Sequence, residues 1–300
     1  MAKLFRLTAL LFLFITCSAS AQTPDSLRQR IERIVSVRKA TVGVAIGCNN
    51  GKDTLSLNGA EHFPLQSVFK FHIAIVVLSE IDKGKLSLDQ KVKIEKKELL
   101  PGLYSPIRDK YPDGVTLTIS ELLKYAISLS DNVACDVLLK LVGGPQVVED
   151  YFVKNGFKDI SIKMNEETQQ SKWENQFQNW TTPKAANKVL EAFYDNKSKF
   201  LSEKSYDFLW KTMKATETGA DRLKGMLPKG MVVAHKTGTS GTKDGVTAAV
   251  NDIGIVFLPN GQYYFISVFV TNSKEDEAAN DKIIADISKA TWDYFMKKAK

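Results

Sequence analysis

The hydrophobic pattern of the chain predicts strands near both ends and helices in between. Close to the start, apolar residues recur at helical spacing behind Asp25, which predicts an amphipathic helix capped by that residue. Short apolar runs then predict strands at 41–46 and 53–57, joined by a turn at 49–51. A helix over about 275–298 closes the chain. Before it, further strands are predicted at 231–238, 247–258 and 262–271.

The middle of the chain carries the longest helical pattern. Residues 68–83 are nearly apolar throughout and stop at a glycine, which predicts a buried central helix. Thr118 and Glu121 form a capping box for a helix over 119–129. Residues 157–181 are polar and broken and predict a long loop. Further helices are predicted at 132–142, at 145–154 and from Pro183. This order of elements favours an α+β fold with an inserted helical domain.

The first 21 residues have the composition of an export signal. Lys3 and Arg6 precede the apolar run 7–17, which is too short to span a bilayer. The small residues 19–21 then predict cleavage before Gln22.

Cys17 offers a second interpretation of this segment, as the lipid-bearing residue of a lipoprotein, but Thr16 fits poorly before such a cysteine. No later run approaches the ~18 apolar residues of a membrane-spanning helix. The sequence therefore predicts an exported protein without a membrane span, periplasmic in a Gram-negative host. Cys48 and Cys135 would remain after cleavage, and two buried free thiols are favoured over a disulfide.

Composition and charge narrow the class of protein. Of 300 residues, 25% are charged and 44% hydrophobic, which excludes a disordered chain, a coiled coil and a collagen-like repeat. Without residues 1–21 the chain has 39 basic and 34 acidic residues, a net charge of +5 with the two signs interspersed, so nucleic acid is not expected as a partner. The three histidines are scattered without zinc spacing, and no metal site is predicted.

The first of three short motifs with candidate chemistry is Ser-x-x-Lys. It occurs three times, but only Ser67 and Lys70 open the long apolar helix, with the serine near unpaired N–H groups and the lysine one turn further on. Burial would lower the pKa of such a lysine, and a neutral amine can take the proton of a serine hydroxyl. Taken alone, the motif fits a capping serine and a surface lysine better.

The other two motifs each occur once. Ser130-Asp131-Asn132 stands between two predicted helices, where all three residue types also serve as helix caps. Lys236-Thr237-Gly238-Thr239 lies on a predicted strand and offers a cation, hydroxyls and a bare backbone edge to a carboxylate-bearing, amide-like ligand. Taken alone, the first of these motifs fits a polar helix break better, and the second fits an ordinary edge strand better.

In this order the three motifs resemble the signature of class A β-lactamases and penicillin-binding proteins. Their spacings, 63 residues from Ser67 to Ser130 and 106 from there to Lys236, suit the smaller β-lactamases. The resemblance covers essentially the whole chain after the export signal. The segments most similar to the VEB/PER branch of class A enzymes are Phe63–Lys70, Tyr104–Pro106, Gln178–Thr181 and Ala234–Ser240.

The resemblance implies a β-lactamase/transpeptidase-like fold, with a five-stranded antiparallel sheet flanked by terminal helices and an inserted all-helical domain. The expected α/β domain comprises residues 22–62 and 212–300, and the expected helical domain residues 63–211. The resemblance also implies a monomer that acts on a small β-lactam without a cofactor. In this branch the site is broad, admits oxyimino-cephalosporins and is inhibited by clavulanate.

The resemblance also implies roles for individual residues. Ser67 is the expected nucleophile, Lys70 shares the proton transfer, and Ser130 protonates the lactam nitrogen. Asn132 is expected to hold the acylamide of the substrate, and the N–H groups of Ser67 and Thr239 to form the oxyanion hole. The other expected substrate-binding residues are Lys236, Thr237, Gly238, Arg222, Gln170 and Tyr104.

The base for deacylation is expected in the loop 157–181. Glu166 is preferred to Glu167, and Glu174 is a third candidate. A carboxylate near Glu166 would repel it and raise one of the two pKa values. The loop departs from the common class A pattern at three points, where the chain has Gln170 and Asp136 in place of asparagines and Met164 in place of an arginine.

Two other functions stay open from the sequence. A D,D-peptidase acting on peptidoglycan has the same motifs with a long-lived acyl-enzyme. A non-hydrolytic β-lactam-binding protein would keep the site without turnover. Glu166 and the compact length favour hydrolysis.

Overall fold

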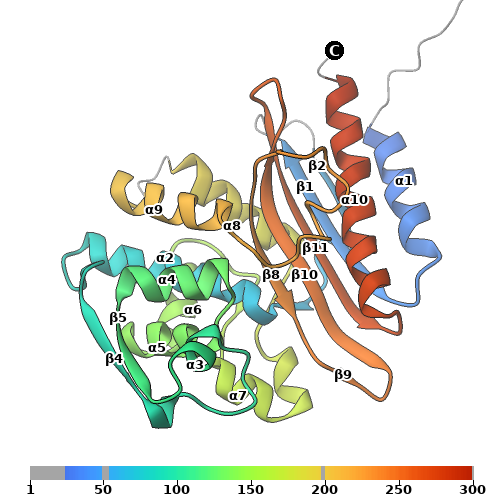
Figure 1. Cartoon of the computed structure of the whole chain (residues 1–300). Helices are drawn as coiled ribbons and strands as arrows, with labels where there is room; N and C mark the ends of the chain where they lie inside the picture. Colours follow the sequence, from blue (N-terminus) through green and yellow to red (C-terminus); the bar gives the residue numbers. More distant parts are fainter. Residues whose placement is uncertain (1–23, 49–53, 197–199, 299–300) are drawn as a thin grey trace, which may run out of the picture.

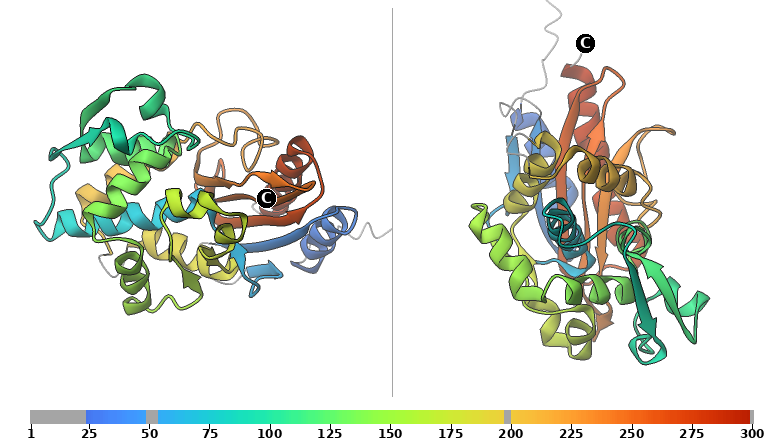
Figure 2. Two further views of the ribbon diagram at one scale, coloured as in Figure 1. Left: turned by 90° about the horizontal axis from the view of Figure 1, so that it is seen from below. Right: turned by 90° about the vertical axis from the view of Figure 1, so that its left-hand side faces the viewer.

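The structure, a computed structural model, describes residues 24–48, 54–196 and 200–298. An antiparallel sheet stands between two helices on one side and a larger helical region on the other (Figures 1 and 2). The predicted five-stranded sheet is confirmed, and the two-residue strand β9 (Thr242–Lys243) also pairs with β10. In spatial order the five strands are β2 (Thr54–Leu57), β1 (Thr41–Cys48), β11 (Tyr263–Ser273), β10 (Val246–Phe257) and β8 (Val233–Thr239). The predicted export signal and the turn at 49–51 lie outside the described residues.

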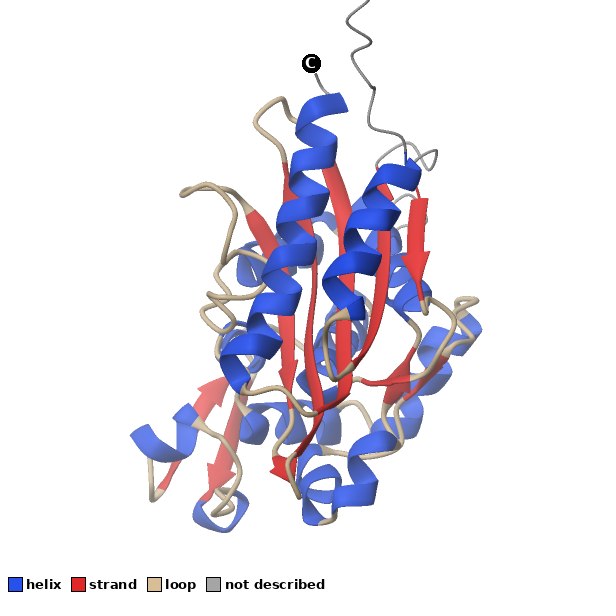
Figure 3. Ribbon diagram, turned by 90° about the vertical axis from the view of Figure 1, so that its right-hand side faces the viewer, coloured by secondary structure: helices blue, strands red, loops and turns tan. Residues whose placement is uncertain are grey.

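The central strands of this sheet are buried on both faces. Helices α1 (Pro24–Ser36) and α10 (Glu277–Lys298) cover one face (Figure 3), where Ile31 and Ile284 join the core formed with strand residues such as Val268. Because neither face meets water, β10 and β11 are nearly continuous apolar runs instead of alternating ones.

The helical region is built around α2 (Phe69–Asp82). Its side chains from Phe69 to Ser79 are buried, because neighbouring helices pack around it (Figure 2). The predicted capping box of Thr118 and Glu121 is present at the start of α4. The other helices of this region are α3 (Pro106–Lys110), α4 (Ile119–Ser128), α5 (Asn132–Leu141), α6 (Pro145–Lys154), α8 (Pro183–Asp195) and α9 (Glu203–Lys214).

The helical region also contains small β elements, so its description as all-helical is too simple. β4 (Lys91–Glu95) pairs antiparallel with β5 (Gly114–Thr118). The alternation of polar and apolar residues over Lys91–Glu95 is the sequence signal for this strand. A three-stranded sheet joins β3 (Phe63–Pro64), β7 (Trp180–Thr181) and β6 (Ile160–Ser161).

The prediction of a long loop over residues 157–181 is incomplete, because the segment contains regular elements. Besides β6 and β7, the segment contains the short helix α7 (Glu166–Ser171) and the 3-10 turn η3 (Trp173–Phe177). The side chain of Asn165 caps α7 by accepting a hydrogen bond from the N–H of Thr168. A helix of six residues leaves no readable periodicity in the sequence.

Candidate active site

Ser67 lies in the 3-10 turn η1 (Gln66–Val68) that leads into α2. The preceding Gln66 has φ = +45°, a left-handed conformation that is uncommon for a residue with a side chain. Lys70 follows in the first turn of α2, and its side chain is fully buried. The simpler interpretation of the motif, with a surface lysine, is therefore wrong.

The hydroxyl of Ser67 lies between two ionisable groups. Lys70 Nζ donates to Ser67 Oγ over 2.8 Å, and Ser67 Oγ donates to Glu166 Oε1 over 3.3 Å. Lys70 and Glu166 form a buried ion pair of 2.9 Å with side chains 0% and 1% exposed. While Lys70 is charged, Glu166 is the acceptor for the hydroxyl proton, and this arrangement can activate a serine.

Two further oxygens hold the Lys70 amine in place. Lys70 Nζ donates to the backbone oxygen of Ser130 over 2.8 Å and to Asn132 Oδ1. A buried ammonium is costly unless its protons are bound, and this set of acceptors meets that need. The contacts bring the first and second sequence motifs together at one nitrogen.

The Ser130-Asp131-Asn132 motif combines both of its sequence interpretations. Asp131 is the N-cap of α5 and is fully buried, and it also accepts hydrogen bonds from Ser105 Oγ and the N–H of Ile107. Burial raises the pKa of Asp131. Ser130 has φ = +59°, and the residues on either side of Asp131 line the cleft. The aspartate therefore fixes the turn that presents its two neighbours.

The third motif lies on β8, at the edge of the sheet beside the cleft. Lys236 Nζ donates to Ser130 Oγ over 2.9 Å and to the backbone oxygen of Thr237. Burial lowers the pKa of Lys236 well below its usual value, and the nearby Lys70 acts in the same direction. A Cβ at Gly238 would lie 2.7 Å from the backbone oxygen of Leu65, which explains why glycine stands there.

The alternating ladder of the sheet leaves every second backbone N–H of β8 directed away from β10, and that of Thr239 is among them. The N–H of Ser240 donates to the oxygen of Ala249, so these two form a hydrogen-bonded pair. Thr239 faces Val250 in the next, non-bonded pair, and its N–H is directed away from β10. This orientation suits its predicted part in the oxyanion hole.

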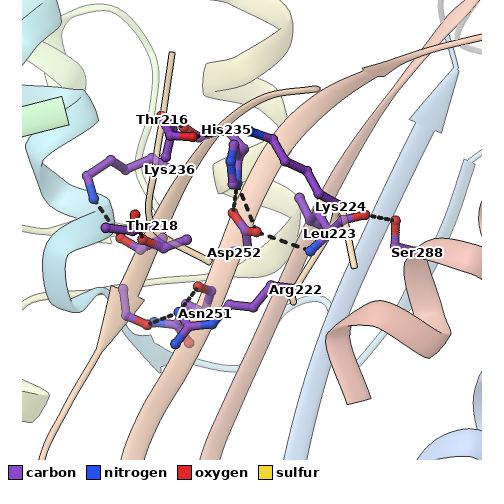
Figure 4. A network of polar contacts seen from close by, with 12 residues as sticks. Thr216, Thr218, Arg222, Leu223, Lys224, His235, Lys236, Asn251, Asp252 and Ser288 are labelled. Carbon is purple, nitrogen blue, oxygen red and sulfur yellow. Dashed lines mark hydrogen bonds and ion pairs between the residues drawn. The ribbon is translucent and has the colours of Figure 1, made fainter. Parts of the chain in front are cut away.

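Arg222 reaches the same strand from a neighbouring segment (Figure 4). Its Nη1 donates to the backbone oxygens of Gly238 and Asn251 over 3.1 Å each, and its Nη2 to Thr239 Oγ1 over 2.8 Å. Asp281 on α10 binds its Nε over 2.7 Å. These contacts fix the guanidinium at the edge of the cleft, next to the Lys-Thr-Gly strand, which is the place that the family resemblance implies.

Asp136 anchors the start of α7. Its two carboxylate oxygens accept the N–H groups of Glu166 and Glu167, over 2.7 and 3.0 Å. Burial raises the pKa of Asp136 to about 7, and the charge of Glu166 adds to that rise while the two N–H groups oppose it. The expected repulsion between the two carboxylates is therefore present, and the helix N-terminus offsets part of it.

Asn179 holds the other end of this segment, and sequence reasoning missed it. Its Oδ1 accepts the N–H groups of Lys163 and Met164, and its Nδ2 donates to the oxygen of Met164 and to Gln169 Oε1. A buried amide thus braces this segment of the chain at Met164 and Gln169.

The three candidates for the deacylating base differ in their burial. Glu166 is buried against Lys70, whereas Glu167 and Glu174 are exposed. Gln170 Nε2 donates to Glu166 Oε2 over 3.1 Å and so orients the carboxylate. Tyr104 is 57% exposed, and its backbone oxygen accepts the N–H of Asn132.

These residues surround a cleft of about 620 Å³. Its lining is Gln66, Ser67, Tyr104, Ser130, Asn132, Gln170, Trp173, Gln176, Thr218, Gly219, Arg222, Thr237, Thr239, Ser240, Gly241, Thr242 and Glu277. A hollow of similar size, about 660 Å³, lies behind Asp136 and Glu167 and contains none of the three motifs. The cleft combines a serine, its activating pair and a cationic edge, which is a site for acyl transfer from a carboxylate-bearing substrate.

Comparison with known proteins agrees with this geometry. The model of the β-lactamase enzyme family matches residues 26–295. The chain is 53% identical over 292 residues to the β-lactamase VEB-1 of Pseudomonas aeruginosa (97% of this chain, 98% of the relative) and 44% identical to the extended-spectrum β-lactamase PER-1 of the same species (97% and 94%). The crystal structure of the TLA-1 extended-spectrum β-lactamase superimposes with a TM-score of 0.88 at 50% identity, covering 91% of this chain and 99% of that one. The chain therefore belongs to the β-lactamase enzyme family, as a class A serine β-lactamase related to VEB-1 and PER-1.

Proposed function

We propose that this chain opens the β-lactam ring through a covalent ester on Ser67 and then hydrolyses that ester with Glu166 as the base. The observation that carries the proposal is the position of Ser67 Oγ, which lies within hydrogen-bond distance of both Lys70 Nζ and Glu166 Oε1. A nucleophile with a buried acid–base pair at this distance can lose its proton as it attacks.

The acylation step follows from these contacts. Ser67 Oγ attacks the lactam carbonyl carbon, its proton passes to the pair of Lys70 and Glu166, and the C–N bond breaks. Ser130, held by Lys236 Nζ, gives its hydroxyl proton to the departing nitrogen, and the proton lost by Ser67 replaces it. The N–H groups of Ser67 and Thr239 stabilise the negative oxygen of the tetrahedral intermediate.

Deacylation consumes one water. Glu166 removes a proton from that water, the hydroxide attacks the ester carbonyl, and Ser67 Oγ leaves with the proton. Gln170, which donates to the second oxygen of Glu166, keeps the carboxylate turned toward the ester. This half-reaction is the one that a D,D-peptidase or a non-hydrolytic binding protein would perform slowly or not at all.

The substrate carboxylate is assigned to the edge of β8. Lys236, Thr237, Thr239 and Arg222 present two cations and two hydroxyls there. Asn132, on the opposite wall, is placed to hold the acylamide. The relatives named as extended-spectrum enzymes support a broad spectrum that includes oxyimino-cephalosporins, with inhibition by clavulanate. Measured efficiency confined to simple penicillins would contradict this assignment.

The compartment is proposed from the sequence. The segment 1–21 predicts export to the periplasm, where an enzyme of this kind would protect cell-wall synthesis and confer resistance. Among the described residues, no helix is both long and apolar enough to cross a membrane.

Turnover of a chromogenic cephalosporin tests the proposed function. Many substrate molecules per enzyme, with an ester adduct seen by intact-protein mass spectrometry in the first turnovers, are expected. A single burst of one product per chain, followed by a stable adduct, would instead identify a D,D-peptidase or a non-hydrolytic binding protein.

A further inference from the structure

A buried histidine–aspartate pair lies directly beside the carboxylate-binding edge (Figure 4). His235, which precedes Lys236 on β8, places its Nδ1 at 2.9 and 3.0 Å from the two oxygens of Asp252 on β10. Both side chains are fully buried. None of the three sequence motifs includes either residue, and neither lines the cleft.

Asp252 has a second donor partner, in the segment that carries Arg222. The N–H of Leu223 donates to Asp252 Oδ2 over 3.3 Å, and the oxygen of Leu223 accepts from Ser288 Oγ on α10. One carboxylate therefore joins β8, which bears Lys236, to the residue that follows Arg222. The two cations of the carboxylate-binding edge are positioned against each other through Asp252.

The contacts of Asp252 suggest a protonation state for this pair that can be tested. The backbone N–H of Leu223 can only donate, and an ionised carboxylate can only accept. If Asp252 is ionised, the donor in its contact with His235 is Nδ1–H, on the ring nitrogen that faces the carboxylate. A neutral amide at position 252 would have one acceptor oxygen in place of two and no negative charge.

The charge of Asp252 also matters to Lys236. The side chain of Lys236 is fully buried, and its Nζ donates hydrogen bonds to the neutral oxygens of Ser130 and Thr237. Burial lowers the pKa of Lys236, whereas the negative charge of Asp252 raises it. A buried cation without a contacting carboxylate depends on such a neighbouring charge.

We propose that Asp252 is a positioning residue for substrate carboxylate recognition, which fixes Lys236 and Arg222 through His235 and Leu223 and balances the buried ammonium. This inference rests on the proposed function, because it concerns the site assigned there to the substrate carboxylate. Asp252 touches no substrate atom and acts only through the residues it holds.

Asp252→Asn tests the inference, because the amide keeps the shape and removes the charge and one acceptor. The KM for a cephalosporin is expected to rise at least about tenfold, the usual effect of losing a hydrogen bond to a charged group. The kcat is expected to stay within about twofold, because Ser67 and Glu166 lie on the other wall. An unchanged KM, or equal losses in kcat and kcat/KM, would overturn the proposal.

A matched control separates positioning from general destabilisation. Asp82→Asn makes the same chemical change at a carboxylate that accepts hydrogen bonds from Ser202 and Ser205 at the start of α9, far from the cleft. It is expected to lower thermal stability and leave KM unchanged. A KM increase in this variant equal to that of Asp252→Asn would mean that stability alone explains the effect.

His235 provides an independent pair of variants. His235→Gln keeps an N–H donor for Asp252, whereas His235→Phe keeps a ring and removes the donor. A raised KM in His235→Phe and near-normal KM in His235→Gln are expected. Equal KM values in the two would overturn the proposal.

A spectroscopic measurement on the native protein covers the case in which a variant does not fold. In ¹⁵N-histidine NMR, His235 is expected to carry its proton on Nδ1, and Asp252→Asn to move it to Nε2. A proton on Nε2 in the native enzyme would overturn the inference while leaving β-lactam turnover, and so the proposed function, intact. Absence of multiple turnovers would instead refute the proposed function.

Discussion

The cleft has a helical wall, which carries Lys70, and a sheet wall, which carries Lys236, and the two buried lysines have different neighbours. On the helical wall, Lys70 Nζ lies 2.9 Å from the carboxylate of Glu166. On the sheet wall, the hydrogen bonds of Lys236 go to the neutral oxygens of Ser130 and Thr237. A lysine beside a carboxylate can exchange a proton with it, but the negative carboxylate largely cancels the attraction of the ammonium for an anionic ligand. A lysine among neutral groups attracts an anion, so the first wall is suited to proton transfer and the second to holding a carboxylate.

The largest effect is expected from removing the nucleophile on the helical wall. Ser67→Ala should lower kcat/KM at least ~10⁴-fold, because acyl transfer loses its attacking atom. Covalent labelling by penicillin should disappear, as seen by mass spectrometry. Ser240→Ala, which changes the serine of another Ser-x-x-Lys segment at the sheet wall, should keep its label. A label mapped to any serine other than Ser67 would contradict the assignment.

The next effect separates the two half-reactions on the same wall. Glu166→Ala should slow deacylation by at least ~10²-fold, about 2.7 kcal/mol of barrier, because Glu166 is the carboxylate in contact with Ser67 Oγ. The acyl-enzyme should then accumulate, with one opened drug per chain by intact mass. Glu167→Ala, whose carboxylate is exposed, should turn over nearly normally. If Glu167→Ala traps the adduct and Glu166→Ala does not, the choice between the two is wrong.

A smaller, selective effect is expected on the sheet wall. Arg222→Ala should raise KM for cephalosporins by about 10-fold or more, because a charge-assisted contact to the substrate is lost, and should lower kcat less. Steady-state kinetics measure the change in KM and the change in kcat separately. Lys229→Ala removes an exposed cation from the same connection and should change neither constant. A fall in kcat with KM unchanged would place Arg222 in the chemistry of the first wall.

A prediction about stability concerns His72, which lies on α2 behind the helical wall. Burial lowers its pKa from 6.5 to about 4, and a backbone contact with Val68 opposes part of that shift. The unfolded chain therefore binds this proton more readily than the folded one between pH 6.5 and 4. The free energy of unfolding should fall by up to about 3 kcal/mol as the pH drops through that window.

Urea unfolding at several pH values measures this loss, and His72→Phe provides the comparison. The variant should show a flatter pH dependence below pH 6.5, since it has no proton to bind. Parallel curves for the two proteins would mean that carboxylates alone cause the acid sensitivity.

Removal of metal ions is expected to have no effect on the rate of hydrolysis. Because the attacking group is a serine hydroxyl activated by Lys70 and Glu166, hydrolysis should be indifferent to EDTA. Loss of activity on chelation, restored by zinc, would refute a serine mechanism on either wall.

Much of the sheet and of both walls could be predicted from the sequence, because the motifs are local. Ser67 lies in the 3-10 turn that leads into α2, Lys70 lies in the first turn of that helix, and Lys236 and Thr237 are adjacent on one strand. The apolar runs of β10 and β11 identify buried strands without knowledge of their partners.

The supports of the site could not be predicted, because they act across long separations. Asn179 binds backbone N–H groups 16 and 15 residues away, and backbone groups carry no side-chain signature in a sequence. Asp281 meets Arg222 over 59 residues, and neither belongs to a motif. Helix α7 has six residues, too few for a helical periodicity to be recognised in the sequence. The sequence therefore predicts a loop where the structure has the helix that orients Glu166.

The two ends of the fold lie side by side. Helix α1 begins at Pro24 and α10 ends at Lys298 at the same end of the sheet (Figures 1 and 3). A short linker between them would make the chain circular, and new ends could then be opened at an exposed turn such as Gly84, far from both walls. The enzyme is therefore suited to circular permutation or to use as a split reporter. In a split reporter, survival of the host cell in the presence of a β-lactam would show that two fused proteins bind each other.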